Sequence, residues 1–495
     1  MVDTPTDNAG KPKSDQNSSG MMKPGDVIID QIYLNTVTGV TLDLKPFFVE
    51  LNIFEDMFSP SLHGSIVIRD SINLIGTVPI IGDEVLTINV RTPFQEVPAQ
   101  DDYFNKIHKS FVIYSIKDRK LNNDREQYYQ LFFCSVEAAK DNVSRISQKY
   151  TGTTDEIVDS IFTEYLALPR TLTDENVTFD PKGEGNTPLF ISDTPHQSMI
   201  TFVPPMWSPM QCINWLAARS IGAKNPSPTY LFFESTKAFY YSSIESLITE
   251  QIDSNSIFCD YVYHPNLSNL TTTSGLSRGY STVEAVKFLT NLDVMQGQDL
   301  GHFASTVHNF DMVKKEYTAY TYDHGFNFNQ FTHMEDYKLS VNEQKTENKF
   351  SVDKDKKYNM IFPINIMRSG DSKRFVATVN PGVLDSTEDS VDLHPETFVA
   401  QRNSALMDLT TMRLQLTVSG RTDIEIGKIV KFYYPSVGEK PKDTAEPFVW
   451  DLLISGLYMI TAIHHQITSL QHKMFVEIAK DSYSFPLYDV TEETS

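Results

Sequence analysis

The chain carries one pattern of glycine and strands twice, and this duplication limits the folds that it can adopt. The first copy consists of a glycine and three apolar runs: Gly82, Val85–Val90, Phe111–Ile116 and Tyr129–Phe133. The second copy has the same layout: Gly427, Ile429–Tyr434, Leu457–Ile463 and Met474–Ile478. The spacing from the glycine to the tyrosine of the second run, Tyr114 or Tyr458, differs by one position between the copies. We interpret the copies as two β modules of one kind.

Ten residues at corresponding places in the two copies are expected to form the strand scaffold and the strands of a ring: Gly82, Leu86, Ile88, Tyr114, Ile116, Gly427, Val430, Phe432, Tyr458 and Ile460. Period-two alternation and frequent turn residues predict antiparallel sheets or open barrels. The predicted fold class is mainly β with α+β elements. It comprises two antiparallel β-barrel or β-sandwich modules, a small α+β domain and an accessory insertion.

A chain of 495 residues is too long for a single core. Changes of pattern divide it into six parts: 1–24 as a disordered tail, 25–150 as the first β module, 151–255 as an α+β domain, 256–325 with 395–483 as a second, discontinuous β module, 326–394 as an accessory insertion, and 484–495 as a C-terminal tail. The insertion is rich in Asn, Asp, Lys and Ser, and its pattern is the hardest to interpret.

Two helices are predicted in the α+β domain. Thr153 and Glu156 have the spacing of a capping box, and an apolar stripe follows them. Ser208 and Pro209 mark the start of a second helix, for which Gly222 is the expected C-cap. A hairpin with its turn at Lys237 follows.

Charge and composition exclude several classes of protein. The net charge is −22, so a protein that grips nucleic acid is not expected. No apolar run approaches the roughly 18–20 residues needed to cross a bilayer, so stable membrane insertion is not expected. Residues 1–24 lack the apolar core of a secretory signal. The three cysteines, Cys134, Cys212 and Cys259, each lie in an apolar run and are expected to be packed thiols in a reducing compartment.

No catalytic or metal-binding pattern stands out in the sequence. His464 and His465 are neighbours on a predicted strand and should point to opposite faces, so they are not expected to bind one ion together. His324 and His333 lie in a polar region where they could approach each other, but a shared metal is not predicted. Gly183–Gly185 has no strand before it and is interpreted as a loop. The sequence therefore predicts no enzyme activity, no cofactor and no metal.

Several blocks of the sequence, in this order, resemble the central hub proteins of contractile-tailed bacteriophage baseplates, of the T-even type: Phe54–Pro60, Gly64–Ser71, Pro79–Glu84, Trp207–Pro209, Ile213–Ala217, Tyr230–Glu234, Ile454–His465 and Glu477–Ser482. The blocks extend discontinuously from Asp26 to Ser482. The tail before Gly25 and residues 326–391 have no counterpart among them.

The resemblance implies two tail-tube-like domains in each chain and a homotrimer. Such a trimer is a ring with pseudo-six-fold symmetry, which joins the hexameric tail tube to the trimeric central spike and encloses the DNA channel. The implied partners are tail tube and tube-initiator proteins, the central spike and the surrounding wedge proteins, while genomic DNA passes without specific binding. The implied location is the virion tail baseplate, assembled in the host cytoplasm. The acidic excess is expected on the inner strands, where it would repel phosphates.

Three alternatives stay open at this point. The duplicated modules could form an ordinary two-domain monomer, in which the open sheet edges need other cover. The hub of a related contractile injection system would share the fold, although those chains usually continue into a fused spike. A tail-associated cell-wall hydrolase would require a carboxylate pair that the sequence does not single out.

Overall fold

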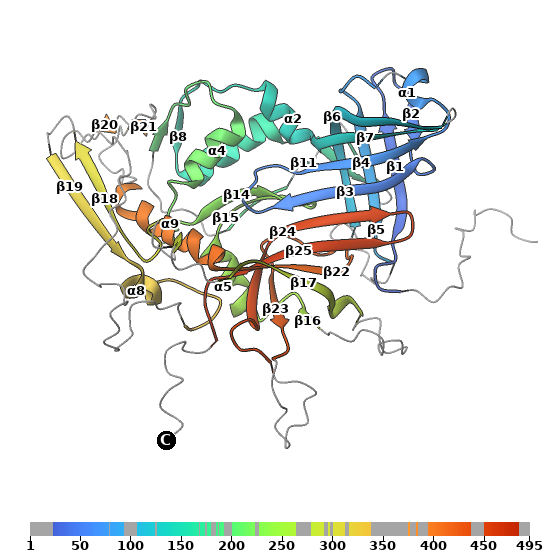
Figure 1. Ribbon diagram of the computed structural model, residues 1–495. Helices are drawn as coiled ribbons and strands as arrows, with labels where there is room; N and C mark the ends of the chain where they lie inside the picture. The colour runs from blue at the N-terminus through green and yellow to red at the C-terminus, as the bar shows by residue number, and fades with distance from the viewer. Residues whose placement is uncertain are drawn as a thin grey trace, which may run out of the picture.

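The fold of the computed structural model is mainly β, as predicted (Figure 1). The structure describes residues 23–484 except for 79, 94–105, 124–125, 168, 174–175, 180–184, 187, 193–199, 223–226, 264–278, 292–295, 298–299, 312–315, 338–374, 377–382, 385–394 and 437–449. The predicted tail 1–24 and the predicted tail 484–495 lie almost wholly outside the described residues. So does most of the predicted insertion, 326–394.

The first β module is an open antiparallel sheet in which the strands follow the order β2-β1-β5-β6-β7-β4-β3. Its strands are β1 (Ile28–Asn35), β2 (Thr41–Asp43), β3 (Phe48–Asp56), β4 (His63–Asp70), β5 (Val85–Arg91), β6 (Lys106–Asn123) and β7 (Glu126–Ser135). A short helix, α1 (Leu74–Thr77), lies between β4 and β5. Alternate residues of these strands, such as Leu51, Ile66 and Leu131, form one buried core.

The second β module is a closed barrel of six strands. These are β16 (Asp260–Tyr263), β17 (Thr282–Asn291), β22 (Met412–Ser419), β23 (Ile429–Tyr433), β24 (Gly456–Thr468) and β25 (His472–Lys480). The barrel closes because β25 pairs with β24 as well as with β22. Strand β16 runs parallel to both of its neighbours, so the barrel departs from the purely antiparallel sheet that alternation predicts.

The two modules share one strand order, which confirms the predicted duplication. Strands β1, β5, β6, β7, β4 and β3 hold the same places in this order as β16, β23, β24, β25, β22 and β17, except that β1 is antiparallel to β5 whereas β16 is parallel to β23. The correspondence extends to a β-bulge, which lies between Ile113 and Ser115 in β6 and between Ile460 and Ala462 in β24. Such bulges are specific local features, so their shared position supports one ancestral unit.

The register corrects one detail of the sequence comparison. Tyr114 is the bulge residue of β6, so its counterpart in β24 is Thr461 and not Tyr458. Tyr458 pairs with Val430 as Phe111 pairs with Leu86, and both aromatic side chains are fully buried. The glycine-to-tyrosine spacing therefore matched a core tyrosine with an exposed one, because spacing carries no information about which face a side chain takes.

The predicted α+β domain has its own core, which contains Val158, Leu216 and Phe239. Its helices are α3 (Thr154–Ile161), the π-helix η2 (Phe162–Leu166), α4 (Pro209–Ala217) and α5 (Ile244–Asp253). Helix α2 (Val136–Val143) packs against η2, although the sequence analysis placed residues up to 150 in the first module. Its strands are β8 (Tyr150–Gly152), β9 (Pro169–Thr173), β10 (Asn176–Phe179), β11 (Gly185–Asn186), β12 (Leu189–Ile191), β13 (Ile200–Phe202), β14 (Tyr230–Glu234) and β15 (Phe239–Ser243). Gly183–Gly185 is only partly described; its last residue begins β11.

Both predicted helix starts are confirmed, because Thr153 and Ser208 each begin a capping box. The predicted C-cap at Gly222 is wrong, since α4 ends at Ala217 and its C-cap is Ala218. The hydroxyl of Ser220 donates to the carbonyl of Leu216 and satisfies the end of the helix before Gly222 is reached.

A projecting hairpin leaves the barrel between β17 and β22. It consists of β18 (Ala304–Asp311) and β19 (Glu316–Asp323), which pair with each other and pack against the long helix α9 (Pro395–Thr411) (Figure 1). The sequence analysis assigned this hairpin to the second β module, but it contributes no strand to the barrel. Two short helices follow it, α8 (His324–Asn327) and η4 (Phe328–Gln330). Strands β20 (Phe375–Val376) and β21 (Val383–Leu384) instead extend the sheet of β13 and β8. In the part of the chain that the structure describes, no helix is long and apolar enough to cross a membrane.

Gly64 tests the packing of the first module. A Cβ atom added there would lie 2.4 Å from the carbonyl oxygen of Asn52 and 2.4 Å from the ring of Phe133. We expect Gly64→Ala to lower the free energy of unfolding by about 3 kcal/mol, because the backbone of β3 and the ring of Phe133 on β7 must both move away from β4. Ser65→Ala is the control, because it adds no volume and removes one hydrogen bond from Gln130, worth about 1 kcal/mol. Urea unfolding of the two variants measures both values; equal losses would contradict the prediction.

Candidate functional site

The candidate functional site is the seam where the first module docks onto the second. Strand β3 pairs antiparallel with the C-terminal half of β24, from Asp56 opposite Ala462 to Glu50 opposite Thr468. In Figure 1 the blue strand β3 and the red strand β24 lie side by side. The same edge of β24 pairs with β23 over its first residues, so β24 serves both the barrel and the seam. The backbone NH of Met57 then donates to the carbonyl of Thr461, the bulge residue.

Side chains on both faces of the seam hold the register. On one face the Nε2 of His464 lies 2.7 Å from the Oδ1 of Asn52, and its ring stacks on Phe54. On the other face His465 is fully buried, with its Nε2 3.0 Å from the Oε1 of Glu55. His464 and His465 thus point to opposite faces, as predicted. His465 Nδ1 also lies 3.0 Å from the Nε2 of His472, and burial holds the pKa of His472 well below its usual range.

The turn between β14 and β15 is inserted at this seam and contacts both modules. The five residues from Glu234, the last residue of β14, to Ala238 are all buried. Glu234 accepts a hydrogen bond from the backbone NH of Leu62 at 2.9 Å and pairs with the ammonium of Lys109, both in the first module. The ammonium of Lys237 donates to the carbonyl of Lys106 in the first module, and to that of Thr422 before the barrel strand β23 at 2.9 Å.

The buried charges of this turn are compensated by groups from several segments. Burial lowers the pKa of Lys237 to about 8, and the carboxylates of Glu425 and Glu55 oppose that shift. Glu425 also accepts hydrogen bonds from the hydroxyls of Tyr240 at 2.7 Å and Ser235 at 3.2 Å. Because an unpaired charge in such a place is costly, these partners bind the turn to both modules in one arrangement.

Each module also has a partly uncovered strand edge that corresponds to one side of the seam. In the first module, β5 covers the edge of β6 only up to Val112, and no described strand pairs with that edge beyond it. This stretch corresponds to the part of β24 that receives β3, and it carries exposed side chains, among them Tyr114 at 54% and Leu121 at 80%. In the barrel, β16 covers the edge of β17 only at Thr282 and Val283 within the described chain, and β17 corresponds to β3.

The ten residues predicted for the ring scaffold do not form one site. Six of them are fully buried in the two separate module cores: Leu86, Ile88, Val430, Phe432, Tyr458 and Ile460. Ile116 is half-buried on β6. Gly82 and Gly427 take φ angles of 108° and 80°, which favour glycine, just before β5 and β23. Gly82 and Tyr114 line a groove of about 690 Å³ between the first module and helices α2 and α4.

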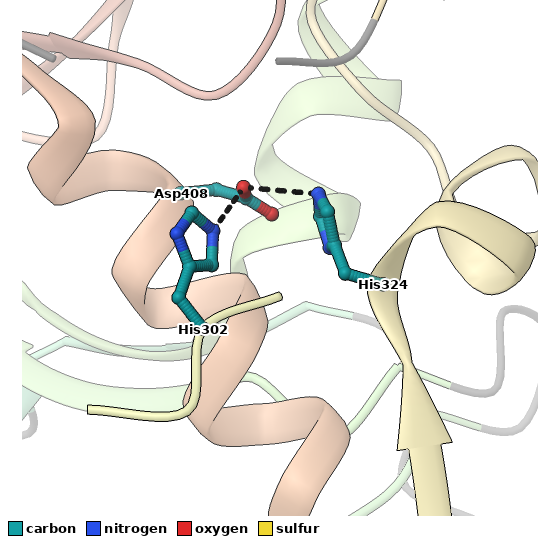
Figure 2. Close-up of side chains that lie close together, drawn as sticks. All are labelled: His302, His324 and Asp408. Atoms are coloured by element: carbon teal, nitrogen blue, oxygen red, sulfur yellow. Dashed lines mark hydrogen bonds and ion pairs between the residues drawn. The ribbon is translucent and has the colours of Figure 1, made fainter. Parts of the chain in front are cut away.

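A buried cluster of two histidines and a carboxylate lies at the base of the projecting hairpin. The Nε2 atoms of His302 and His324 lie 2.8 Å and 3.4 Å from the Oδ1 of Asp408 (Figure 2). The ligand atoms of all three residues lie within 4.8 Å of one another, a set that could hold a metal ion. The sequence analysis missed this cluster because His302 and Asp408 are 106 positions apart and share no motif.

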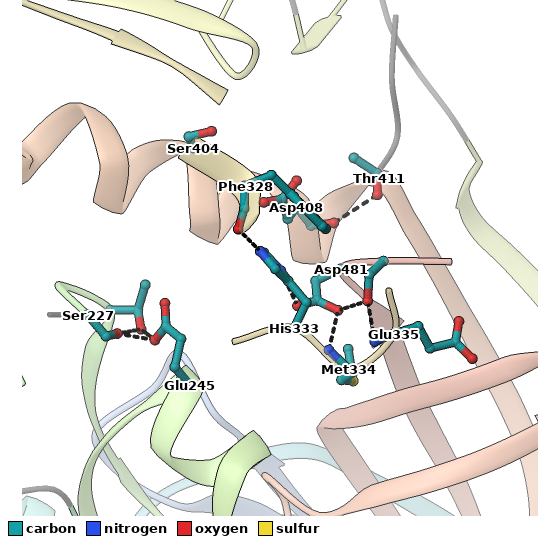
Figure 3. A network of polar contacts seen from close by, with 12 residues as sticks. Ser227, Glu245, Phe328, His333, Met334, Glu335, Ser404, Asp408, Thr411 and Asp481 are labelled. Carbon is teal, nitrogen blue, oxygen red and sulfur yellow. Dashed lines mark hydrogen bonds and ion pairs between the residues drawn. The ribbon is translucent and has the colours of Figure 1, made fainter. Parts of the chain in front are cut away.

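The predicted proximity of His324 and His333 is indirect, since the ring of Phe328 packs against both. His333 instead belongs to a neighbouring polar network (Figure 3), where its Nδ1 lies 3.0 Å from the Oδ2 of Asp481. Asp481 also accepts from the backbone NH of Met334 at 3.3 Å. The side-chain hydrogen bond and charge of Asp481 raise the pKa of His333, although burial alone would lower it. This network ties the segment after the hairpin to the end of β25.

Comparison with solved structures finds one tail protein at a TM-score of 0.50 and others below it. The match to the tail protein from Neisseria meningitidis MC58 covers 91% of this chain and 96% of that protein's chain, at 8% identity and a TM-score of 0.50. The 43 kDa tail protein of prophage MuSo2 from Shewanella oneidensis covers 91% and 98% at 8% identity and a TM-score of 0.48. The Francisella PdpA–VgrG complex covers 93% and 60% at 9% identity and a TM-score of 0.40. No family model and no curated protein sequence matches the chain. The first structure shows that the chain shares the fold of a tail protein.

The ion pair between Glu234 and Lys109 is expected to be essential for the docked arrangement. Glu234→Gln keeps an acceptor for Leu62 but leaves the Lys109 ammonium buried without a counter-charge, so we expect a loss of about 3–5 kcal/mol in the free energy of unfolding. Adding Lys109→Met should recover most of that loss. The exposed pair of Arg91 and Asp30 provides the control, because Arg91→Ala should cost less than about 1 kcal/mol. Urea unfolding of the four proteins measures these values; similar losses for the two single variants would contradict the prediction.

The buried Lys237 is expected to make stability depend on pH. Its pKa is about 8 when folded and about 10.4 in an unfolded chain. The unfolded state therefore binds more protons between these values, so the wild type should gain stability relative to Lys237→Met as the pH rises from about 8 to 10. The gain should be about 1 kcal/mol per pH unit or somewhat more. Unfolding free energies of both proteins at pH 7, 8, 9 and 10 measure the difference; a difference that is constant with pH would refute the assignment.

Proposed function

We propose that the chain is the central hub of a contractile-tail baseplate, in which three copies form a ring of six β modules. The ring adapts a hexameric tail tube to a trimeric spike and encloses a channel through which DNA passes without specific binding. Its partners are the tail tube and tube-initiator proteins, the central spike and the surrounding wedge proteins. The seam between β3 and β24 is the observation that carries this proposal, because it joins two modules of one kind head to tail.

Repetition of the seam supports a closed ring. A head-to-tail contact either closes into a ring or continues as a filament, and two modules per chain allow three chains to supply six positions. The contact within the chain uses β3 and β24; its counterpart between chains would use β17 and β6. Beyond the stretches paired with β16 and β5, both counterparts have an edge that no described strand covers, and such edges are places for strand addition.

The register of the seam predicts which residues meet between chains. Opposite Phe54 in the seam lies His464. His464 corresponds to Lys117, because each lies three residues after the bulge residue of its strand, Thr461 in β24 or Tyr114 in β6. Phe54 pairs with His63, which pairs with Cys134 on β7. Thr290 pairs with Arg413, which pairs with Ala479 on β25. Cys134 and Ala479 hold corresponding places in the two modules, so Phe54 corresponds to Thr290. Lys117 of one copy should therefore lie opposite Thr290 of the next.

The fold likeness to a tail protein supports the same proposal. The solved structure that shares the fold is that of a tail protein, and the match covers 91% of this chain. The net charge of −22 supports a channel that repels phosphate rather than one that binds it.

A pair of engineered cysteines tests the ring. We expect the variant Lys117→Cys with Thr290→Cys, oxidised with a mild agent, to give a covalent species of three chains, because opposed residues on paired strands have the short Cβ separation that a disulfide needs. Denaturing electrophoresis detects the covalent species, and light scattering of the wild type measures the mass of the particle in solution.

Three controls separate the specific contact from random oxidation. Each single cysteine variant should stay a monomer under denaturing conditions, and so should Lys117→Cys with Lys287→Cys, which is out of register by three residues. The native thiols of Cys134 and Cys212 are buried, so they should contribute little background. A wild-type particle of one chain would overturn the proposal, and equal cross-linking in both registers would overturn the assigned pairing.

A further inference from the structure

The cluster at the base of the projecting hairpin joins three segments that are distant in the sequence. His302 precedes β18, His324 follows β19, and Asp408 lies in the last turns of α9 (Figure 2). All three residues are buried, with exposed fractions of 2%, 3% and 4%. Buried groups of this kind are usually paired or bind a metal ion, so the arrangement needs a physical explanation.

Ser404 determines which nitrogen of His324 carries its proton. The hydroxyl of Ser404 donates to the carbonyl of His302 at 2.6 Å, because a carbonyl can only accept. The same hydroxyl lies 3.1 Å from the Nδ1 of His324, so Nδ1 must be the donor of that second hydrogen bond. The neutral imidazole then has its lone pair on Nε2, which is the atom directed at Asp408. A histidine that donates through one nitrogen and presents the other is the usual arrangement of a metal ligand.

We propose that His302, His324 and Asp408 bind one divalent transition-metal ion, and that zinc(II) fits the site best. Two imidazoles and one carboxylate are a typical set of protein ligands for zinc, and hard cations such as magnesium prefer oxygen ligands alone. The inference is independent of the proposed function, because the cluster lies outside both β modules.

The observed separations are close to those of a coordinated ion. Zinc lies about 2.0–2.2 Å from nitrogen and oxygen ligands, which places two ligand atoms of a tetrahedral site about 3.3 Å apart. The separation of 3.4 Å between His324 Nε2 and Asp408 Oδ1 matches this value. The separation of 2.8 Å between His302 Nε2 and Asp408 Oδ1 would have to increase by about 0.5 Å. His302 lies in a short segment after Gly301, whose φ of 76° marks a turn and not a rigid strand.

A metal ion at this place would fasten the hairpin to the body of the protein. Its two histidine ligands stand at the two ends of the β18–β19 hairpin, and its carboxylate stands on α9, which leads directly into barrel strand β22. The ion would thus close the loop from residue 302 to residue 324 and fix it on the helix. Because the ligands come together only in the folded chain, part of the metal-binding free energy would stabilise this region.

The rival explanation is a metal-free cluster, in which a proton shared between the imidazoles and Asp408 supplies the positive charge. Both explanations place a positive charge beside the buried carboxylate of Asp408, but they differ in whether the protein binds a metal ion. Only the metal site predicts a defined stoichiometry and coordination by two imidazoles.

The test uses the full chain, stripped with a chelator and then titrated with Co²⁺ and Zn²⁺. We expect one tight equivalent of either ion per chain, visible d–d absorption from Co²⁺ that Zn²⁺ abolishes by displacement, and slower amide hydrogen exchange in strands β18 (304–311) and β19 (316–323) with the ion bound. X-ray absorption of the zinc-loaded wild type should show two imidazole ligands.

Two ligand variants and one control complete the test. His324→Gln and Asp408→Asn should each weaken metal binding at least about 100-fold. Removing a metal ligand should reduce the affinity at least as much as removing a residue that hydrogen-bonds to a ligand. His308→Gln is the matched control on β18, and it should bind as the wild type does. The proposal is overturned if the wild type binds no ion tightly, if its zinc has no imidazole ligand, or if the ligand variants bind as tightly as the control. The wild-type spectroscopy decides the question even if a variant fails to fold.

Discussion

The pairing of β3 with β24 is the contact on which the rest of the architecture depends. It makes one sheet of 13 strands from an open module and a closed barrel, so the main-chain groups of β3 have partners on both sides. An open module without this contact would expose a long edge, which is a hazard in aqueous solution. The seam also fixes the position of one module relative to the other, which the duplication alone would not do.

The turn from Glu234 to Ala238 secures that contact with charges. Apolar side chains alone would hold the modules together, but they would tolerate small shifts of one sheet over the other. A buried ammonium at Lys237 and a buried carboxylate at Glu234 tolerate few arrangements, because each needs defined partners at hydrogen-bond distance. The α+β domain therefore fixes the angle between the modules by inserting a polar turn between them. If three copies form a ring, this is the angle on which its closure depends.

Much of the local structure could be predicted from the sequence. Alternation located the strands around Leu86, Ile66 and Val430, and the capping residues Thr153 and Ser208 located two helix starts. These predictions succeeded because a capping residue acts within one turn and alternation acts within one strand. Tyr114 was matched with the wrong residue of the second copy, because the glycine-to-tyrosine spacing does not record which face of a strand a side chain takes. The histidine cluster escaped prediction because its members come from segments with no shared periodicity.

The sequence by itself determined that the chain has two β modules of one kind, separated by an α+β domain, since the apolar pattern and the turn residues act locally and are repeated. Only the tertiary structure decided that β3 docks on β24, that Lys237 is buried between the modules, and that His302, His324 and Asp408 meet at one point. The physical reason is that these contacts join residues far apart in the chain. Their partners are chosen by burial, register and charge in the folded molecule, and none of these is recorded in the spacing of residues along one segment.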